Sequence, residues 1–495
     1  MRKIIPAILA FLLLVTAAVA QDRPMLGRRG THRPHWTERR AASGQDKGPG
    51  GDFYFGERHQ LTVLAEFADQ AFSGDEQATI AQWDKILNTV HLNESPFVGS
   101  MHDYFNDQSY GLFNLVCDML YIKVGNRVRY GSTEEDDENS QYLVLDIVDS
   151  LVKRDIDWSR YDWNGDGYVN QVLIIYAGKG SSYGGFGGGY DAIWPHQWWL
   201  SEHIADRASG TYQQPRRINY QGKEYTIDSY CAVQELASND SYGTFGTLCH
   251  EYTHCFGFPD FYNDNMTTTP GYWELMDYGS YNGSGFCPAG YSAHERWLME
   301  WLTPIELEQT AVITNMPALS DNPTAYLIRN DGYESEYYIV ENRQNKGWDA
   351  SLPGSGVLVF HIDYVPEIWL SDDGSAMPNT NTQQHYMIIK ANNKASRMNC
   401  SGWAYPYREN NSLTDTSTPA ATLWHDNING TQLMSKPLTG ITVTDGLASF
   451  EFTNSMTDVE QVSLDSRPNA KFLRDGQILI RRGDGIYTLT GQQIR

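Results

Sequence analysis

The sequence predicts an α+β (α/β-like) first domain, followed by a β-rich module and a small β-stranded C-terminal tail. Three observations support this organisation. Up to about residue 305, apolar strand-like runs alternate with segments of helical spacing. From Leu307 onward, short runs rich in β-branched and aromatic residues are separated by Gly and Asn. The final segment, 462–495, contains a hairpin pattern.

The individual elements follow from the same patterns. In the first domain, apolar runs bounded by polar turns predict buried strands at 61–67 and 171–177, and helical spacing predicts helices at 82–90, 142–153 and 247–256. In the β-rich module, strands are predicted at 326–328, 337–340, 357–362 and 386–389, and 441–452 closes it. In the tail, 478–480 and 486–489 are predicted to pair through the turn 481–485.

Composition excludes several classes of protein. With 41% hydrophobic and 20% charged residues, the chain is not disordered throughout. Its 37 Lys and Arg against 61 Asp and Glu give a net charge of −24. A chain this acidic does not bind polyanions by bulk charge, so nucleic acid is not an expected partner, whereas bound cations suit it.

The N-terminus has the features of an export signal. Arg2 and Lys3 precede the apolar run 4–15, and the small residues of 18–20 form a cleavage site before Gln21. A membrane anchor is the alternative, but the apolar run is short and no stop-transfer pattern follows. No later segment has about 18 consecutive apolar residues, so no integral membrane segment is expected after signal cleavage. We therefore expect a secreted or cell-surface protein.

The chemistry is concentrated between residues 250 and 260. On a helix, positions i and i+4 share a face, so His250 and His254 can point imidazole nitrogens at one metal ion. Glu251 lies beside that face and can reach a water molecule on the metal. Gly257 can end the helix in a left-handed conformation, and the chain can then turn back so that Asp260 supplies an oxygen ligand. Three protein ligands with an open fourth position is the catalytic zinc pattern.

This pattern is specific. With 13 histidines in the chain, chance gives on the order of 0.02 His-Glu-x-x-His matches. The alternative is an ordinary surface helix with two satisfied histidines, which the scarcity of histidine disfavours. The six cysteines contain no Cys-x-x-Cys pair, so a thiolate zinc site is not predicted.

The motif resembles that of zincin/metzincin-type metallopeptidases whose third zinc ligand is Asp, and it is most similar to the immune inhibitor A-like secreted metalloproteases. Further similarity lies at 100–105, 109–111, 166–169, 174–178, 193–196, 341–344 and 352–358. The resemblance implies a zincin/metzincin-type catalytic domain and a zinc endopeptidase that acts on extracellular proteins. Asp260 is the expected third ligand, and the nearby alternatives are Glu274, Asp277 and Glu295.

A second element of the resemblance follows the helix. Met276 resembles the methionine that lies on a tight turn beneath the zinc in metzincins, and Tyr278 stands where some of those enzymes place a tyrosine near the metal. The expected mechanism has Glu251 take a proton from zinc-activated water and pass it to the leaving amine, while Tyr278 hydrogen-bonds the oxyanion. The alternative is that Met276 and Tyr278 are plain core residues.

A separate loop resembles the first half of an EF-hand calcium loop. Its oxygen ligands at positions 1, 3, 5, 7 and 9 are Asp162, Asn164, Asp166, Tyr168 and Asn170. Position 12 is Leu173 rather than Glu, so a carboxylate from elsewhere, such as Asp155 or Asp157, is needed to complete a site for structural calcium. The alternative is a simple Asx/Gly turn before a strand.

The tail looks like a bacterial type IX secretion sorting domain, on the residues 475–480 and 485–492. This resemblance implies a bacterial secretion machinery as a partner; the alternative is a last hairpin packed on the β-rich module. The expected organisation is therefore a signal peptide (1–20), a linker or short pro-segment (21–51), a zinc metallopeptidase domain (52–305), a β-rich module (306–455) and a sorting tail (456–495).

Two functions from different classes remain. The first is a secreted zinc endopeptidase acting on protein or peptide substrates. The second is a catalytically inactive surface binding protein that retains the peptidase fold and uses the β-rich module to hold a host protein or glycan. The intact Glu251 favours the enzyme. Exopeptidase action is a further alternative that depends on the shape of the cleft.

Overall fold

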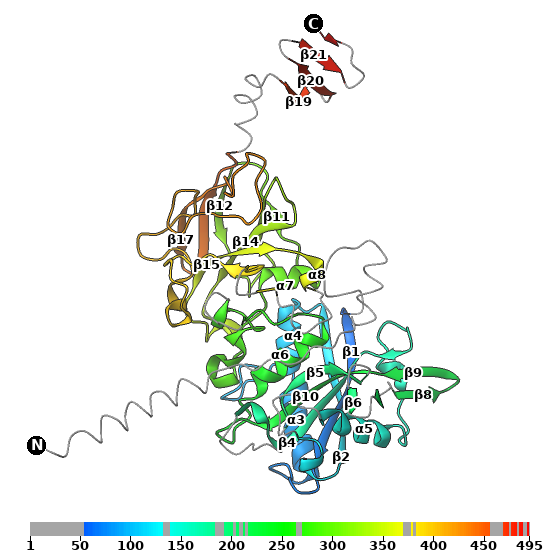
Figure 1. Ribbon diagram of the computed structural model, residues 1–495. Coiled ribbons are helices and arrows are strands. Elements are labelled where there is room, and N and C mark those ends of the chain that lie inside the picture. The colour runs from blue at the N-terminus through cyan, green and yellow to red at the C-terminus, as the bar shows by residue number, and fades with distance from the viewer. Residues whose placement is uncertain are drawn as a thin grey trace, which may run out of the picture.

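The computed structural model in Figure 1 describes residues 54–131, 139–183, 193–200, 204–206, 211–212, 216–263, 270–369, 378–379, 383–455, 469–474, 477–482, 485–488 and 493–494. The predicted signal peptide and the linker or pro-segment lie outside these residues. None of the described helices is long and apolar enough to cross a membrane.

A five-stranded sheet forms the centre of the catalytic domain, in the order β2-β1-β4-β10-β5. Its strands are β1 (Gly56–Glu66), β2 (Phe113–Lys123), β4 (Val172–Lys179), β5 (His196–Trp199) and β10 (Ser229–Leu236). The first four strands in this order are parallel, and β5 runs antiparallel to β10 at the edge. The strands predicted at 61–67 and 171–177 are confirmed as β1 and β4.

Helices cover this sheet (Figure 1). They are α3 (Glu76–Asn88), α4 (Met101–Gln108), α5 (Ser140–Leu151) and α6 (Phe245–Cys255), whereas α7 (Ala293–Leu298) lies beside β14 of the β-rich module. The predicted helices at 82–90, 142–153 and 247–256 are confirmed as α3, α5 and α6. Local sequence fixes their starts: Asp75 caps α3, and Ser100 with Asp103 forms a capping box that begins α4.

Shorter elements complete the domain. The strands are β3 (Tyr168–Val169), β6 (Ile204–Asp206), β7 (Thr211–Tyr212), β8 (Arg216–Tyr220) and β9 (Lys223–Ile227). The 3₁₀ helices are η1 (Arg127–Arg129), η2 (Trp158–Arg160), η3 (Ser181–Tyr183), η5 (Gly271–Trp273) and η6 (Tyr278–Gly285). Strand β3 pairs with β9, which joins the predicted calcium loop to the hairpin of β8 and β9.

The β-rich module contains two sheets. The first has the order β11-β13-β14-β15-β16, with β11 (Ile305–Glu306), β13 (Tyr326–Arg329), β14 (Glu336–Arg343), β15 (Gly356–Asp363) and β16 (Tyr386–Ile388). The second has the order β12-β18-β17, with β12 (Ala311–Met316), β17 (Leu438–Thr444) and β18 (Leu447–Phe452). Helices η7 (Gly347–Asp349) and α8 (Pro366–Trp369) lie between successive strands of the first sheet, and η8 (Arg397–Gly402) lies between β16 and β17. The strands predicted at 326–328, 337–340, 357–362 and 386–389 are confirmed, and the closing segment 441–452 lies in the hairpin of β17 and β18.

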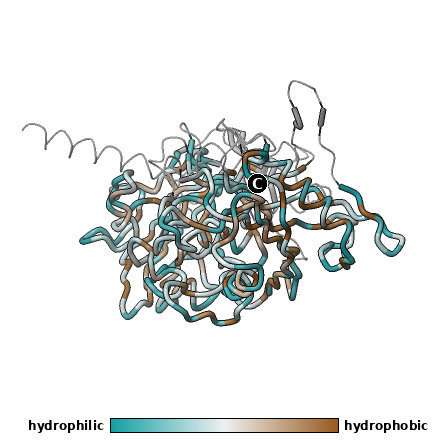
Figure 2. Tube along the Cα trace, turned by 90° about the horizontal axis from the view of Figure 1, so that it is seen from below, coloured by the Kyte–Doolittle hydropathy of each residue, from teal (hydrophilic) through white to brown (hydrophobic). Residues whose placement is uncertain are grey.

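The first sheet of the module divides the core because successive side chains of a strand point to opposite faces. On one face, Ile339 and Phe360 join a large cluster that contains the core of the catalytic domain. On the other face, Val340 and Val359 join a smaller cluster with the second sheet. The catalytic domain and the β-rich module therefore share a continuous core. Figure 2 shows the hydrophilic loops at the periphery of the chain.

The tail forms a four-stranded antiparallel sheet of β19 (Asn469–Arg474), β20 (Gln477–Arg482), β21 (Gly485–Thr488) and β22 (Gln493–Ile494). Ile480 is the partner of Tyr487 in the pairing of β20 with β21, so the predicted hairpin is confirmed. Its role in secretion stays a prediction.

Candidate active site

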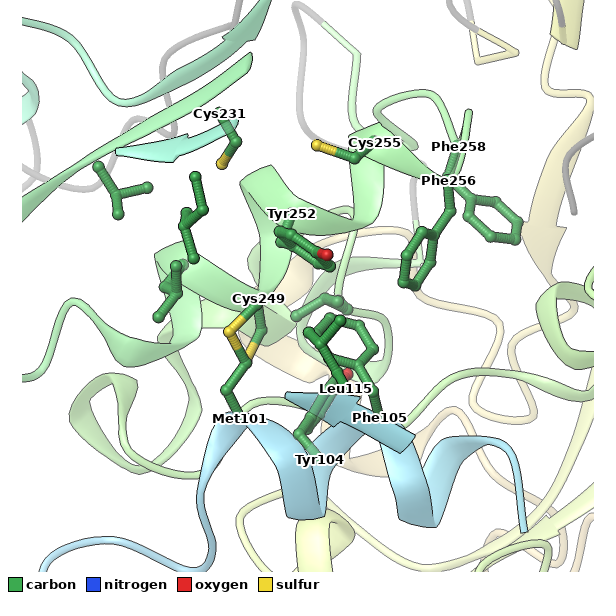
Figure 3. Close-up of a cluster of buried hydrophobic side chains, with 14 of the residues drawn as sticks. Met101, Tyr104, Phe105, Leu115, Cys231, Cys249, Tyr252, Cys255, Phe256 and Phe258 are labelled. Carbon is green, nitrogen blue, oxygen red and sulfur yellow. The ribbon is translucent and has the colours of Figure 1, made fainter. Parts of the chain in front are cut away.

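Helix α6 carries the His-Glu-x-x-His motif and is buried along almost its whole length. Figure 3 shows Cys249 and Tyr252 on the side of α6 that faces α4, where Met101, Tyr104 and Phe105 lie. The Tyr252 hydroxyl donates to Gln60 Oε1 (2.6 Å) on β1 and accepts from Gln171 Nε2 (2.9 Å). This buried polar network ties the helix to the sheet and so fixes its rotation about its own axis.

The first turn of α6 depends on a glycine. A Cβ atom added at Gly246 would lie 1.9 Å from the Ser280 carbonyl oxygen in η6. No side chain fits in that space. Gly246 therefore allows the helix to approach the segment that follows Met276, which also contacts the site.

The two histidines are held by backbone carbonyls. His250 Nδ1 lies 2.9 Å from the Leu275 carbonyl oxygen, and His254 Nδ1 lies 2.8 Å from the Phe258 carbonyl oxygen. When Nδ1 donates to a carbonyl, the Nε2 lone pair remains available for a metal ion. Both imidazoles are buried, and their ring centroids are 4.9 Å apart.

The chain then turns back as the sequence pattern predicts. Gly257 has a φ of +93°, which a residue with a Cβ rarely adopts. The turn places Asp260 Oδ1 3.1 Å from His250 Nε2 and 3.3 Å from His254 Nε2. The three ligand atoms lie within 4.8 Å of one another, and no other group of three His, Cys, Asp or Glu side chains among the described residues meets this spacing.

The chemistry of this donor set fits zinc, which prefers tetrahedral nitrogen and oxygen ligands. Although Asp260 Oδ1 lies close to both imidazoles, it makes no hydrogen bond of good geometry within the described part of the chain. The same holds for the buried Glu251 Oε2. Buried polar atoms normally have hydrogen-bond partners, so converging atoms without them indicate a place for a ligand.

Charges shift the pKa values of these groups. Burial by itself would lower the pKa of His250, but Asp260 and Glu251 more than offset this effect and raise the pKa to about 9. Burial would raise the pKa of Asp260, yet His254 and His250 hold it well below its usual range. Burial raises the pKa of Glu251 to about 8, against the lowering effect of His250. A bound dication would lower all three values.

The segment around Met276 supports both parts of the site. The Leu275 carbonyl holds His250, and the Met276 carbonyl accepts from Phe261 N (2.8 Å), next to Asp260. Met276 and Tyr278 are buried, and the Tyr278 ring lies 5.4 Å from the Tyr272 ring. The catalytic role of Tyr278 stays a prediction.

The alternative third ligands make other contacts. Asp277 accepts from Gly271 N (2.6 Å) and Tyr278 N (2.9 Å). Glu295 accepts from Ser292 N (2.7 Å) in the capping box of α7. Glu274 is buried, and Glu295 helps to raise its pKa. Of the four candidates, Asp260 is the one that the structure brings to His250 and His254.

The predicted calcium loop has a different arrangement. Asp162 Oδ2 accepts from Lys223 Nζ (2.7 Å) and from Gly167 N (3.0 Å), whereas Asp162 Oδ1 is buried without a hydrogen-bond partner in the described residues. The other four predicted ligands make hydrogen bonds within the loop: Asp166 Oδ1 accepts from Tyr168 N, Asn164 Nδ2 donates to Asp166, and Asn170 Oδ1 accepts from Trp163 N. Asp157 caps η2. Calcium at this loop stays a prediction.

Sequence reasoning missed several residues of the site. Lys223 on β9 places a cation beside Asp162, and Gln60 and Gln171 anchor the motif helix. The backbone carbonyls of Leu275 and Phe258 orient the two histidines. A backbone carbonyl is present at every residue, so the sequence pattern does not show which ones contact the imidazoles. The polar glutamines next to apolar strand runs were the available signal for the buried network.

Comparison with known proteins assigns a class to this geometry. Residues 61–302 match the family described as immune inhibitor A peptidase M6, catalytic domain. Over 269 residues, 46% of this chain and 28% of the relative, the chain is 27% identical to the pre-pro-metalloprotease PrtV of Vibrio cholerae serotype O1. Over 278 residues, 48% of this chain and 38% of the relative, it is 26% identical to immune inhibitor A of Bacillus thuringiensis subsp. alesti.

These matches are partial. The chain spans well under half the length of the relatives, and the matched segment is just under half of this chain. The matched segment contains α6, the turn to Asp260 and Met276. The chain therefore carries a metalloendopeptidase catalytic domain, of the hydrolase class, similar to that of immune inhibitor A.

Proposed function

We propose that this chain is a secreted zinc-dependent endopeptidase that hydrolyses peptide bonds of extracellular proteins. The observation that carries the proposal is the convergence of His250, His254 and Asp260 within 4.8 Å, with the buried carboxyl group of Glu251 on the same helix. His250 Nε2, His254 Nε2 and Asp260 would hold the ion. When bound there, zinc supplies Lewis-acid polarisation of the scissile carbonyl and lowers the pKa of water.

Glu251 is the general base of this proposal. Glu251 is 3% exposed, and burial raises the pKa of its carboxyl group to about 8. A carboxylate of this kind can take a proton from the attacking water and return it to the leaving amine. Tyr278, two residues after Met276, is proposed to donate to the oxyanion of the tetrahedral species.

Substrate would lie along the edge of the central sheet. Strand β5 is the last strand of that sheet, and it pairs on one side with β10 from Trp199 opposite Ser229 to His196 opposite Ala232. An edge strand can pair with an extended peptide through its main chain. This edge strand supports the proposal of endopeptidase action on extended segments of protein substrates.

The test compares the full chain with Glu251→Gln and with Glu308→Gln, a matched change at an exposed glutamate. Zinc content and digestion of denatured casein are measured with and without a chelator. We expect about one zinc per chain in all three proteins, with cleavage lost in Glu251→Gln and in the chelator. Casein cleavage by Glu251→Gln at the wild-type rate would refute the role of Glu251. A wild-type chain with neither zinc nor cleavage would favour the inactive binding protein, whereas zinc without cleavage would indicate latency through residues 21–51 or narrow specificity.

Export and attachment form a second part of the proposal. It rests on the apolar run after Arg2 and Lys3 and on the resemblance of the tail to a type IX sorting domain. Deletion of residues 462–495 in a host with that machinery should leave the protein in the periplasm, as measured by fractionation. Export of the truncated chain at the wild-type level would contradict the sorting role.

Structural calcium in the loop of Asp162, Asn164, Asp166, Tyr168 and Asn170 is the last part of the proposal. The buried Asp162 Oδ1 atom, which lacks a hydrogen-bond partner in the described residues, supports it. Lys223 already neutralises part of the charge, so calcium would compete with this ammonium group.

A further inference from the structure

We propose that Asn379, in the β-rich module, is a positioning residue for the metal ligand Asp260. The inference rests on the proposed zinc site and adds to it a residue outside the segment that matches the peptidase family, since that segment ends at residue 302. It makes the β-rich module a part of the catalytic centre.

The Asn379 side chain uses both of its N–H donors and its carbonyl oxygen in hydrogen bonds to backbone groups. It is 1% exposed. Its Nδ2 donates to the Phe261 carbonyl oxygen (2.7 Å) and to the Tyr386 carbonyl oxygen (2.6 Å), and its Oδ1 accepts from Tyr386 N (2.9 Å). The amide is thus fixed on β16 by two bonds to Tyr386, and its remaining N–H is directed at the residue that follows Asp260.

Both backbone polar groups of Phe261 are hydrogen-bonded, and its ring packs against two other aromatic rings. Its N–H donates to the Met276 carbonyl (2.8 Å), and its carbonyl accepts from Asn379. Its ring lies 4.3 Å from the Tyr386 ring and 5.3 Å from the Trp369 ring, measured between centroids. The segment from Phe258 to Asn263 belongs to no helix or strand, so these contacts replace a regular hydrogen-bond ladder there.

The position of Asp260 follows from these contacts. Asp260 is one peptide unit from Phe261, and its Oδ1 must stay close to two imidazoles at once. Metal–ligand distances tolerate errors of only about 0.2 Å. Loss of the hydrogen bond from Asn379 frees the Phe261 carbonyl inside the core, and the chain must shift to satisfy it. Groups that orient metal ligands typically change metal affinity by about 10- to 100-fold when they are removed.

The chain offers a matched control in Asn427. This residue is 3% exposed, and its Nδ2 donates to two carbonyls, those of Leu433 (3.1 Å) and Met434 (3.0 Å), while its Oδ1 accepts from Ile428 N (2.8 Å). It makes the same number and kind of hydrogen bonds as Asn379. Its partners, however, lie in the β-rich module and not next to a zinc ligand.

The experiment uses the full chain with Asn379→Ala, the nearly isosteric Asn379→Asp, Asn427→Ala and Asn427→Asp. Zinc affinity is measured by competition with a chromogenic chelator. The visible absorption of the cobalt(II)-substituted protein reports ligand geometry, and thermal melting reports stability. If an alanine variant does not fold, the aspartate variant, which keeps the shape and loses the N–H donors, provides the comparison.

We expect both Asn379 variants to lose about 10- to 100-fold in zinc affinity and to change the cobalt spectrum. Both Asn427 variants should lower the melting temperature but keep the wild-type affinity and spectrum. Wild-type zinc affinity and spectrum in the Asn379 variants would overturn the inference, as would equal losses in the Asn427 variants. A wild-type chain that binds no zinc would instead refute the proposed function, and this inference with it.

Discussion

Substitution of Arg343 on β14 tests whether the core shared by the catalytic domain and the β-rich module contributes strongly to stability. Its guanidinium is buried and donates to Asp349 from Nε (2.7 Å) and Nη2 (2.6 Å), to Glu341 from Nη1 (3.1 Å) and to the Gly290 carbonyl (2.9 Å). Glu341 in turn accepts from Ala293 N (2.7 Å) at the start of α7. One arginine therefore neutralises two buried carboxylates that face the catalytic domain.

Arg343→Met removes the cation and leaves both carboxylates buried. Removing one partner from a buried pair costs about 3–5 kcal/mol. A body of about 400 residues has an unfolding entropy of roughly 0.8 kcal/mol per kelvin, so the melting temperature should fall by roughly 4–6 °C. Burial already raises the pKa of Glu341, and loss of Arg343 raises it further. The variant therefore gains a proton on folding, and its deficit should be larger at pH 8 than at pH 5.

The assay is thermal melting at both pH values, with Arg329→Met as the control. Arg329 lies on β13 of the same sheet and pairs with Glu306 (2.9 Å) near the surface, where such a pair contributes about 0–1 kcal/mol. A shift in Arg343→Met no larger than that of the control would refute the reasoning. A deficit that does not depend on pH would show that the carboxylates are not its cause.

Three further predictions follow from the same structure. Gly246→Ala should reduce zinc retention, because its Cβ would meet the Ser280 carbonyl at 1.9 Å; unchanged zinc content would contradict this. Burial and Glu295 raise the pKa of Glu274 in the folded protein, so stability should fall as the pH rises from the ordinary glutamate pKa toward this raised pKa. Glu274→Gln mimics the protonated acid, so its melting temperature should exceed that of wild type by a margin that grows as the pH rises above the ordinary glutamate pKa. Excess calcium should raise the melting temperature, less in Asp162→Asn and more in Lys223→Met; no shift in any protein would count against calcium.

Much of the fold was predictable because the strongest strands and helices have clear periods. The segment that forms β4 is a nearly continuous apolar run, as expected for a strand that is buried on both faces. The helical spacing of α5 places its apolar residues on one face. Strand β10 was missed, since Ser229, Gln234 and Glu235 interrupt its apolar character. Gln234 and Glu235 are buried, and Glu235 Oε1 and Oε2 accept from the backbone N–H groups of Ser73 and Gly178, so tertiary contacts set that strand.

The candidate site divides in the same way. His250, Glu251 and His254 were predictable from one helical turn, because spacing on a helix fixes which side chains share a face. Asp260 needed the left-handed conformation of Gly257 as well, and the glycine gave that indication. Lys223 was not foreseen beside Asp162, because it comes from another strand that reaches the loop through the pairing of β3 with β9.

The sequence by itself therefore determined the chemistry that this protein carries: the donor types, their spacing along one helix, and the turn that follows. Only the tertiary structure decided which of four acidic residues joins the histidines, which carbonyls orient the imidazoles, and that Asn379 lies against Phe261. The physical reason is the separation along the chain of the residues that interact. Helical spacing and glycine conformation act over a few residues, whereas these contacts join segments that are distant in the chain and meet only when the shared core is packed.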